Sequence, residues 1–353
     1  MLCRQLEILD AQNEKTGVEM NGYSEKNLME RFESSIRNPL DDKTGQPYFD
    51  EFSKCTKDKL SKVNVLHITN YHMFIKALGY CKYSLCKDLK TNYRVFFRGQ
   101  ERLYGDSFQP ALYRGCTQVG AIAKRNQRIK AMVAQVQKRS KVLRTLHPAV
   151  VEGLLQHYGA KTRWVDAVDN LWVALWFACH HAWCENLCGE EHLHYSLRDP
   201  RHEEADRRFA YVYVLAVNTY RDKKNGRRSL YTQFIPGLNF GEEGEVLDLR
   251  YALPSQYIRP HVQHGVLLRT YDASTGFEVD MCRMVKLIIR IDIEDALSWL
   301  GESHALSTVS MFPPAIFDTG YQELLRLEKE LLSKSLKDDN IKPVEIFHPQ
   351  RVE

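Results

Sequence analysis

A group of polar side chains that could do chemistry lies between residues 157 and 166. The group surrounds a glycine and combines an imidazole, a phenol, two cations and a carboxylate: His157, Tyr158, Gly159, Lys161, Arg163 and Asp166. An imidazole transfers protons near pH 7, and a carboxylate stabilises positive charge that develops on a substrate. Spacing leaves two interpretations open. Arg163 and Asp166 form a structural pair against the core, or they face a cleft.

Arg98 is a second candidate because of the strand that precedes it. Residues 93–97 are rich in aromatic and β-branched side chains, which predicts a strand that ends at Arg98 and Gly99. Functional residues are often displayed at such a strand end. The structural alternative is that Arg98 caps a carboxylate across the sheet.

The elements that must position these residues follow from the apolar pattern. Strands are predicted at residues 63–68, 93–97, 162–165, 209–217, 265–271 and 284–291, and helices at 71–79, 120–143, 148–157, 171–184, 293–300 and 321–336. Gly79 is expected to end the first helix, and Asp169 or Asn170 to cap the apolar, buried fourth one. Residues 184–207 are predicted to be irregular and 237–244 to form a loop. Strands and helices mix without regular alternation, which predicts an α+β fold.

Length and composition favour one large folded domain. The chain has 353 residues, of which 44% are apolar or aromatic, enough to bury a large core. We expect a polar, loosely packed leader over residues 1–60, the domain over 61–336 and a tail over 337–353. The longest apolar run, 171–179, is shorter than the ~20 residues that span a bilayer, and Glu7 and Asp10 interrupt any export signal. A cytoplasmic protein without a membrane span is expected.

Cysteine and histidine side chains concentrate between residues 179 and 194. Seven of them could ligate a metal: Cys179, His180, His181, Cys184, Cys188, His192 and His194. Zinc takes tetrahedral sets of such ligands, but this spacing fits no standard finger. The absence of a predicted export signal indicates reduced thiols. We expect neither a metal site nor a disulfide framework.

The stretch over residues 124–144 carries positive charge without an opposing acid. Its basic residues within the predicted helix are Lys124, Arg125, Arg128, Lys130, Lys138, Arg139 and Lys141. The net charge of the whole chain is only +4, so this stretch is the sole electrostatic indication of a large anionic partner. One interpretation is a solvated helix face. The other is a nucleic-acid contact, whose affinity would depend strongly on salt.

The sequence lacks the motifs of several common enzyme classes. It lacks a Walker lysine loop and the motifs Gly-x-Gly-x-x-Gly, Gly-x-Ser-x-Gly and His-Glu-x-x-His. The sequence therefore disfavours a P-loop kinase, a dehydrogenase, an esterase and a zinc protease.

Ordered motifs between about residues 61 and 332 resemble those of the FRG domain family. They are Phe97-Arg98-Gly99-Gln100, residues 108–114 (FQPALYR), residues 156–166 (QHYGAKTRWVD), residues 174–178 (ALWFA), Arg259 with Gln263-His264-Gly265, and Ser310-Met311-Phe312-Pro313. Lys161 stands where the family usually has a proline, and Trp164-Val165 replaces a leucine pair. Neither departure removes a polar residue of the pattern.

The order of these motifs is similar to the layout of ADP-ribosyltransferases, which implies a central, mostly antiparallel split sheet with an NAD site. By this resemblance Arg98 and Gly99 bind the phosphate or ribose of NAD, and Tyr158 and Arg163 make further cofactor contacts. Residues 162–166 stand where transferases carry the strand that supports the nicotinamide end.

The same resemblance sets Gln263 at the position of the catalytic glutamate. A neutral amide can hydrogen-bond the ribose, but it cannot supply the charge of a carboxylate. Asp166 is therefore our first choice for the acid, and His157 is a candidate general base. Gln263 has a structural alternative, a hydrogen bond to the backbone at the start of a strand.

These inferences predict an NAD-handling enzyme of ADP-ribosyltransferase type, with NAD as co-substrate and no metal. The acceptor would be a protein or nucleic acid bound through the basic helix over residues 124–144. Families of this kind resemble toxins and phage-defence proteins of bacteria. The competing hypotheses are a non-catalytic module that senses a nucleotide or nucleic acid, and a protein-interaction domain whose polar motifs are purely structural.

Overall fold

The computed structural model describes residues 65–86, 93–103, 108–116, 119–187, 190–201, 207–218, 234–241, 244–270, 281–301 and 306–335. By its contacts the chain divides into two units, residues 1–49 and 50–353, and every described residue belongs to the second. The expected leader over residues 1–60 and the expected tail over 337–353 lie outside the described residues.

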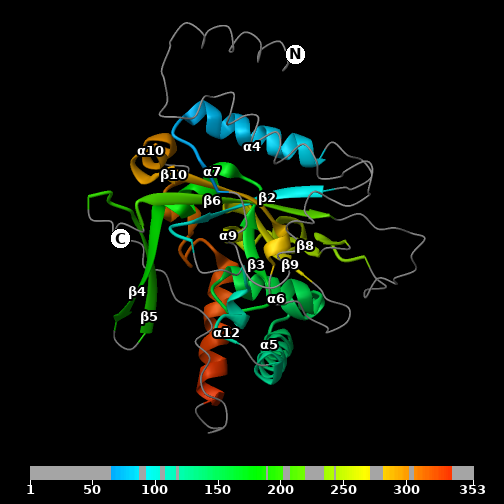
Figure 1. Cartoon of the computed structure of the whole chain (residues 1–353). Coiled ribbons are helices and arrows are strands. Elements are labelled where there is room, and N and C mark those ends of the chain that lie inside the picture. Colours follow the sequence, from blue (N-terminus) through cyan, green and yellow to red (C-terminus); the bar gives the residue numbers. More distant parts are fainter. Residues whose placement is uncertain are drawn as a thin grey trace, which may run out of the picture. The chain divides into compact units, whose positions relative to one another are not determined.

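The described strands form an eight-stranded sheet in the order β1-β10-β6-β2-β3-β9-β8-β7 (Figure 1). The first half-sheet contains β1 (Val65–His67), β10 (Val285–Asp292), β6 (Phe209–Asn218) and β2 (Tyr93–Gln100). The second half-sheet contains β3 (Val165–Val168), β9 (Gly265–Arg269), β8 (Glu245–Asp248) and β7 (Leu238–Phe240). Of the described pairs in this sheet, β1 with β10 is parallel and the others are antiparallel. The predicted α+β class is confirmed.

The two half-sheets meet at a narrow joint between β2 and β3. Strand β2 pairs with β6 along its whole length, but with β3 only where Phe97 lies opposite Val168. One side chain also crosses the joint, because Nη1 of Arg98 donates to the main-chain oxygen of Asp166 at 2.6 Å. The sheet is thus continuous, and the backbones diverge on either side of this single pair.

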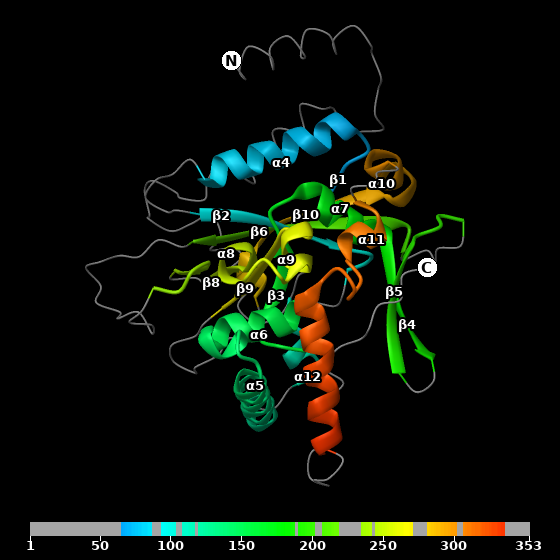
Figure 2. The same ribbon diagram turned by 180° about the vertical axis from the view of Figure 1, so that it is seen from behind.

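Two groups of helices pack against the two half-sheets. Helices α4 (Tyr71–Cys86), α7 (Leu171–Cys179) and α10 (Ile293–Leu300) lie along the first half-sheet (Figures 1 and 2). By the second half-sheet lie α5 (Val119–Arg139), α6 (Pro148–His157) and α12 (Thr319–Ser335), whose inward side chains share one apolar cluster with Leu247 of β8 and Leu267 of β9. Shorter helices are α8 (Leu249–Ala252), α9 (Ile258–Val262) and α11 (Thr308–Met311). Single 3-10 turns occur at Ala111–Tyr113, Leu143–Thr145 and Cys282–Met284.

Local capping fixes where the helices next to the polar group begin. The ring of His147 accepts a hydrogen bond from the main-chain nitrogen of Ala149, and Pro148 follows it as the first residue of α6. Asn170 accepts from the main-chain nitrogen of Trp172 and so caps α7. The predicted bounds of α6 and α10 are confirmed, and of the two predicted caps for α7 Asn170 is the one used.

Two predicted element ends in the first half-sheet region are wrong. Helix α4 does not end at Gly79 but continues to Cys86, because its buried stripe continues with Leu85. A glycine inside a helix costs only ~1 kcal/mol relative to alanine, which such burial offsets. Strand β2 does not end at Arg98 but continues to Gln100, because residues 98–100 still pair with β6.

The predicted irregular segment after α7 is wrong as well. Helix α7 ends at Cys179, and a separate hairpin follows, made of β4 (His180–Leu187) and β5 (Glu190–Leu197). The strands pair with each other, and rings stabilise the pairing, with Trp183 stacked on His194 at 4.5 Å between centroids. The predicted loop over 237–244 contains β7, and β3 begins at Val165 where the extended piece was predicted to end.

Candidate functional site

A cavity of about 280 Å³ lies at the joint between the half-sheets, close to the lower end of the size range of small-molecule sites. Its walls come from β2, β3, α7, α9, the end of α6 and the turn after it, strand β5 and the residue after α11. Six of the predicted site residues line this cavity: Arg98, Gly99, His157, Tyr158, Asp166 and Gln263.

Asp166 is a carboxylate held by neighbours within the cavity. One oxygen accepts from Nε2 of Gln156 at 2.6 Å, and the other lies 3.5 Å from Nδ1 of His157. Burial raises the pKa of Asp166, but the hydrogen bonds and charges of His157, Arg98 and Gln156 outweigh burial and hold it below the ordinary 3.8. Asp166 is therefore ionised at neutral pH.

Gln156 and His157 orient this carboxylate from the last turn of α6. The amide oxygen of Gln156 accepts from the hydroxyl and main-chain nitrogen of Thr162, which leaves its amide nitrogen for Asp166. The ring of His157 packs on Gly265, where an added Cβ would come within 2.7 Å of it. Its Nε2 is shielded from solvent and has no hydrogen-bond partner among the described residues. This geometry suits His157 to positioning Asp166 better than to exchanging protons with a ligand.

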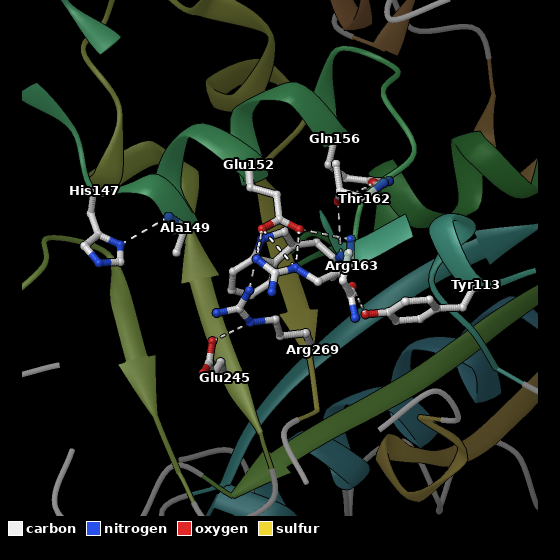
Figure 3. A network of polar contacts seen from close by, with 11 residues as sticks. Tyr113, His147, Ala149, Glu152, Gln156, Thr162, Arg163, Glu245 and Arg269 are labelled. Carbon is white, nitrogen blue, oxygen red and sulfur yellow. Dashed lines mark hydrogen bonds and ion pairs between the residues drawn. The ribbon is translucent and has the colours of Figure 1, made fainter. Parts of the chain in front are cut away.

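Arg163 lies outside the cavity, contrary to both predicted arrangements. Its guanidinium makes an ion pair with Glu152, and Arg269 links Glu152 to Glu245 (Figure 3). Trp164 stacks under the Arg269 guanidinium at 4.1 Å. Glu152 is only 2% exposed in its side chain, so this cluster pairs buried charges beneath α6. Arg163 pairs with Glu152 and not with Asp166.

Tyr158 and Gln263 present less polar chemistry to the cavity than their types suggest. The hydroxyl of Tyr158 donates to Asp318 at 2.5 Å, and burial together with that carboxylate raises the pKa of the phenol. Gln263 follows α9 and does not begin a strand. Its amide donates to the main-chain oxygen of Met311 at 2.7 Å, so the predicted backbone hydrogen bond of Gln263 is present.

Sequence analysis missed an aromatic wall on the hairpin side of the cavity. Tyr195 of β5 stacks on Phe312 at 4.4 Å between centroids, and Phe177 meets Phe312 edge to face. Tyr195 was not identified because residues 184–207 were predicted to be irregular. The available signal was Gly189, which separates two segments of strand length in the sequence.

Comparison with known families agrees with the motifs. The model of the FRG domain family matches residues 93–186. The resemblance to the FRG domain family is thus confirmed over this segment. No curated protein and no solved structure matches the chain.

The segment matched as an FRG domain runs from the first residue of β2 into β4, and it supplies most of the cavity. Arg98, Gly99, His157 and Asp166 lie within it. Arg259 and Gln263, which complete the cavity, lie outside the matched segment. The site therefore needs chain beyond the FRG match.

Gly99, the glycine of the FRG motif, allows α7 to approach β2. A Cβ at this position would lie 1.7 Å from the main-chain oxygen of Ala174. Because no side chain fits there, α7 rests directly on the strand. Packing alone therefore requires a glycine at position 99, whether or not Gly99 also contacts a ligand.

The Cys/His stretch after the FRG motifs gives no metal cluster within the described part of the chain. No group of three or more His, Cys, Asp and Glu there is placed to hold an ion. Burial raises the pKa of Cys179 to about 12, so its thiol stays protonated and is a poor ligand. The side chains of Cys184, Cys188 and His192 lie outside the described residues.

The basic residues of the 124–144 stretch that lie in α5 mostly face outward. Ile129, Val133 and Val136 face the core, and the opposite face exposes Lys124, Arg128 and Lys138. Arg125 instead donates to main-chain oxygens of Leu112 and Arg114.

None of the described helices is long and apolar enough to cross a membrane.

Proposed function

We propose that the protein is an NAD-handling enzyme of ADP-ribosyltransferase type, which transfers ADP-ribose or hydrolyses NAD. The ionised Asp166, held by His157 and Gln156 in a cavity at the joint of the sheet, carries this proposal. The order of the motifs along the chain, in which the Arg-Gly strand precedes the strand of Asp166, resembles the layout of those transferases and supports the proposal.

The chemistry requires a negative charge beside the ribose. When the bond between ribose C1′ and nicotinamide breaks, the electron pair leaves with the nicotinamide and the ribose gains oxocarbenium character. A fixed carboxylate stabilises that charge. Asp166 supplies it, because Gln263 is a neutral amide engaged with Met311. The acceptor then bonds to C1′ and loses its proton to solvent, since a carboxylate with a lowered pKa is a weak base.

Further contacts of NAD are assigned by the same proposal. Arg98 and Gly99 contact the ribose or phosphate, and the ring of Tyr158 lies at the cavity wall beside them. The exposed face of α5 receives a polyanionic or acidic acceptor. The family resemblance alone motivates the extension to a toxin or phage-defence role in the cytoplasm.

Nicotinamide release tests the proposal. Purified protein is incubated with NAD, with and without candidate protein and nucleic-acid acceptors, and nicotinamide is measured by mass spectrometry. We expect the wild type to release nicotinamide. Asp166→Asn removes a charge that acts in the transition state and should lower release by at least about a hundredfold. Arg201→Met, at an exposed arginine that does not line the cavity, should cause no loss. No release from folded wild type under any of these conditions would refute turnover.

A non-catalytic nucleotide sensor is the second candidate, and the state of Gln263 favours it. The amide that replaces the catalytic glutamate is only 4% exposed and is bound to the backbone of Met311. A sensor predicts that wild type binds NAD or another nucleotide without turnover. Arg98→Ala would then weaken binding with no reaction to lose.

A further inference from the structure

We propose that Arg259 forms an anion subsite in the cavity, which receives a phosphoryl group of the ligand. The inference rests on the proposed function only in taking the ligand to be a nucleotide. It assigns the phosphate to Arg259, whereas the resemblance to transferases assigns phosphate or ribose to Arg98.

The guanidinium of Arg259 is buried at the cavity wall with unused donors. The residue is 3% exposed and lines the cavity. Its Nε and Nη2 have no hydrogen-bond partner among the described residues. A buried cation without acceptors is unfavourable, and each unsatisfied donor adds to the penalty. An oxyanion in the cavity would satisfy both donors.

Aromatic rings explain how the fold tolerates this charge in the absence of a ligand. The guanidinium lies over Tyr158 at 4.5 Å, over Tyr321 at 4.8 Å and over Phe312 at 5.4 Å. The negative faces of such rings attract a cation. We call the rings of Tyr158, Tyr321 and Phe312 the aromatic cage. The cage holds the guanidinium but supplies no oxygen acceptor to Nε and Nη2, so these two donors remain available to a ligand.

The carboxylate beneath the cage is committed elsewhere. One oxygen of Asp318 accepts from the Tyr158 hydroxyl at 2.5 Å and from the main-chain nitrogen of Arg259 at 3.2 Å. The other accepts from the main-chain nitrogen of Tyr321 at 2.9 Å, in the first turn of α12. Within the described residues, no ion pair joins Asp318 to the guanidinium. Asp318 therefore fixes the cage without ion-pairing to the cation.

The remaining charges of the cavity favour an anion. Arg98, Lys161 and Arg259 line it against the single carboxylate of Asp166, which already interacts with His157 and Arg98. A phosphoryl group offers several acceptor oxygens, and the planar guanidinium can donate two parallel hydrogen bonds to them. Phe312 lies beside Arg259 and carries the stacked Tyr195, so an aromatic surface adjoins the subsite.

Pairs of ligands that differ only in a phosphate test the subsite in the full chain. Dissociation constants are measured by calorimetry for AMP against adenosine, and for nicotinamide mononucleotide against nicotinamide riboside. We expect the phosphorylated member of at least one pair to bind wild type about ten- to a hundredfold more tightly, as charge-assisted hydrogen bonds do. In Arg259→Met, which fills the cage without charge, this ratio should fall close to one.

Two further variants separate recognition from folding. Arg201→Met, at an exposed arginine, should keep the ratio. Arg259→Lys keeps the charge but loses the paired donors, so its preference for the phosphorylated ligand should be intermediate. This variant tests the subsite if Arg259→Met does not fold. A purely structural Arg259 would lower the melting temperature and leave the ratio unchanged.

The outcomes also distinguish this inference from the proposed function. An unchanged ratio in the folded Arg259 variants, or no preference of wild type for a phosphate in either pair, overturns the subsite even if NAD is cleaved. A ratio that collapses in the variants supports the subsite even if wild type releases no nicotinamide. In that case only the enzymatic proposal fails.

Discussion

Asp166 keeps its charge through interactions with neighbours from other segments of the chain. Its pKa is held below 3.8 by His157, Arg98 and Gln156 against the effect of burial. A carboxyl whose pKa is lower in the folded than in the unfolded state contributes stability that is present above the unfolded pKa. That stability is lost as the pH falls through the folded value. The same interactions that prepare the site therefore make it sensitive to acid.

We expect acid unfolding to report this coupling. Between pH 5 and pH 2 the free energy of unfolding should fall for the wild type, and it should fall less steeply for Asp166→Asn, which has no proton to take up. Urea titrations at half-unit intervals of pH measure both slopes. Parallel curves for the two proteins would show that Asp166 is not held in its charged form.

His180 gives a second acid-sensitive position, with a different pH window. It stacks on Trp176 at 3.7 Å between centroids, and its Nδ1 donates to the main-chain oxygen of Trp176. Burial lowers its pKa from 6.5 to about 4, so the folded protein holds it neutral while the unfolded chain takes up a proton. Stability should therefore decline as the pH falls from 6.5 toward 4.

This decline should amount to about 2 kcal/mol by pH 5, as a shift of that size implies. His180→Phe retains a stacking ring and should show a flatter profile between pH 7 and pH 5. His72→Phe, at an exposed histidine, is the matched control and should keep the wild-type slope. The inference about His180 fails if its variant and the control give the same profile.

At the scale of elements, the contact between β2 and α7 sets the back of the cavity. Gly99→Ala would place a methyl group against the backbone of α7, where it would meet the oxygen of Ala174. Because the clash is with main-chain atoms, which cannot move aside as a flexible side chain can, we expect the free energy of unfolding to fall by about 3 kcal/mol or more. Gly79→Ala in α4 meets no atom within 4 Å and should instead stabilise by about 0.5–1 kcal/mol. Thermal and urea unfolding compare the two, and equal effects would contradict the close approach.

The outer face of α5 is the element on which polyanion binding can be tested. Reversing Lys124, Arg128 and Lys138 to Glu should weaken binding of a mixed-sequence duplex. It should also reduce the slope of log K against log salt by about 2–3 if each residue neutralises one phosphate. A matched variant reverses three exposed charges on other segments, Lys82, Arg208 and Arg283. Equal losses in both variants would assign binding to net charge and not to α5.

At the scale of the whole molecule, strands distant in the sequence lie side by side in the sheet. Strand β2 pairs with β6, and β3 pairs with β9. Both partner strands lie beyond residue 186, where the FRG match ends. A fragment of residues 93–186 would leave β2 and most of β3 without their ladders and would expose their apolar faces.

We expect that fragment to remain unfolded, whereas residues 65–335 fold cooperatively. Circular dichroism and amide proton dispersion distinguish the two states. A fragment of 93–186 with native-like dispersion would show that the partner strands are dispensable. The result bears on function as well, because Arg259 and Gln263 reach the cavity only when the later segments are present.

Several elements could be predicted from the sequence because their signals are local. The proline at 148 begins α6, the polar side chain at 170 caps α7, and the apolar run over 209–217 forms the core of β6. The hairpin of β4 and β5 had no local signal except Gly189, because its strands lack a clear apolar alternation and are stabilised by each other. The extension of β2 beyond Arg98 could likewise not be predicted from the sequence, since it depends on pairing with β6.

The sequence by itself determined the α+β class and which short segments carry the polar side chains of the site. These follow from periodicity, capping and spacing, which act over a few residues. Only the tertiary structure decided which of those side chains meet. Arg163 turns to the buried Glu152, while the carboxylate of Asp166, three residues on, contacts Gln156 and His157 of α6. Arg259 acquires its cage only when α12 and the residue after α11 pack against the end of α6. Burial and charge pairing join residues far apart in the chain, so they are settled when the sheet and its helices come together.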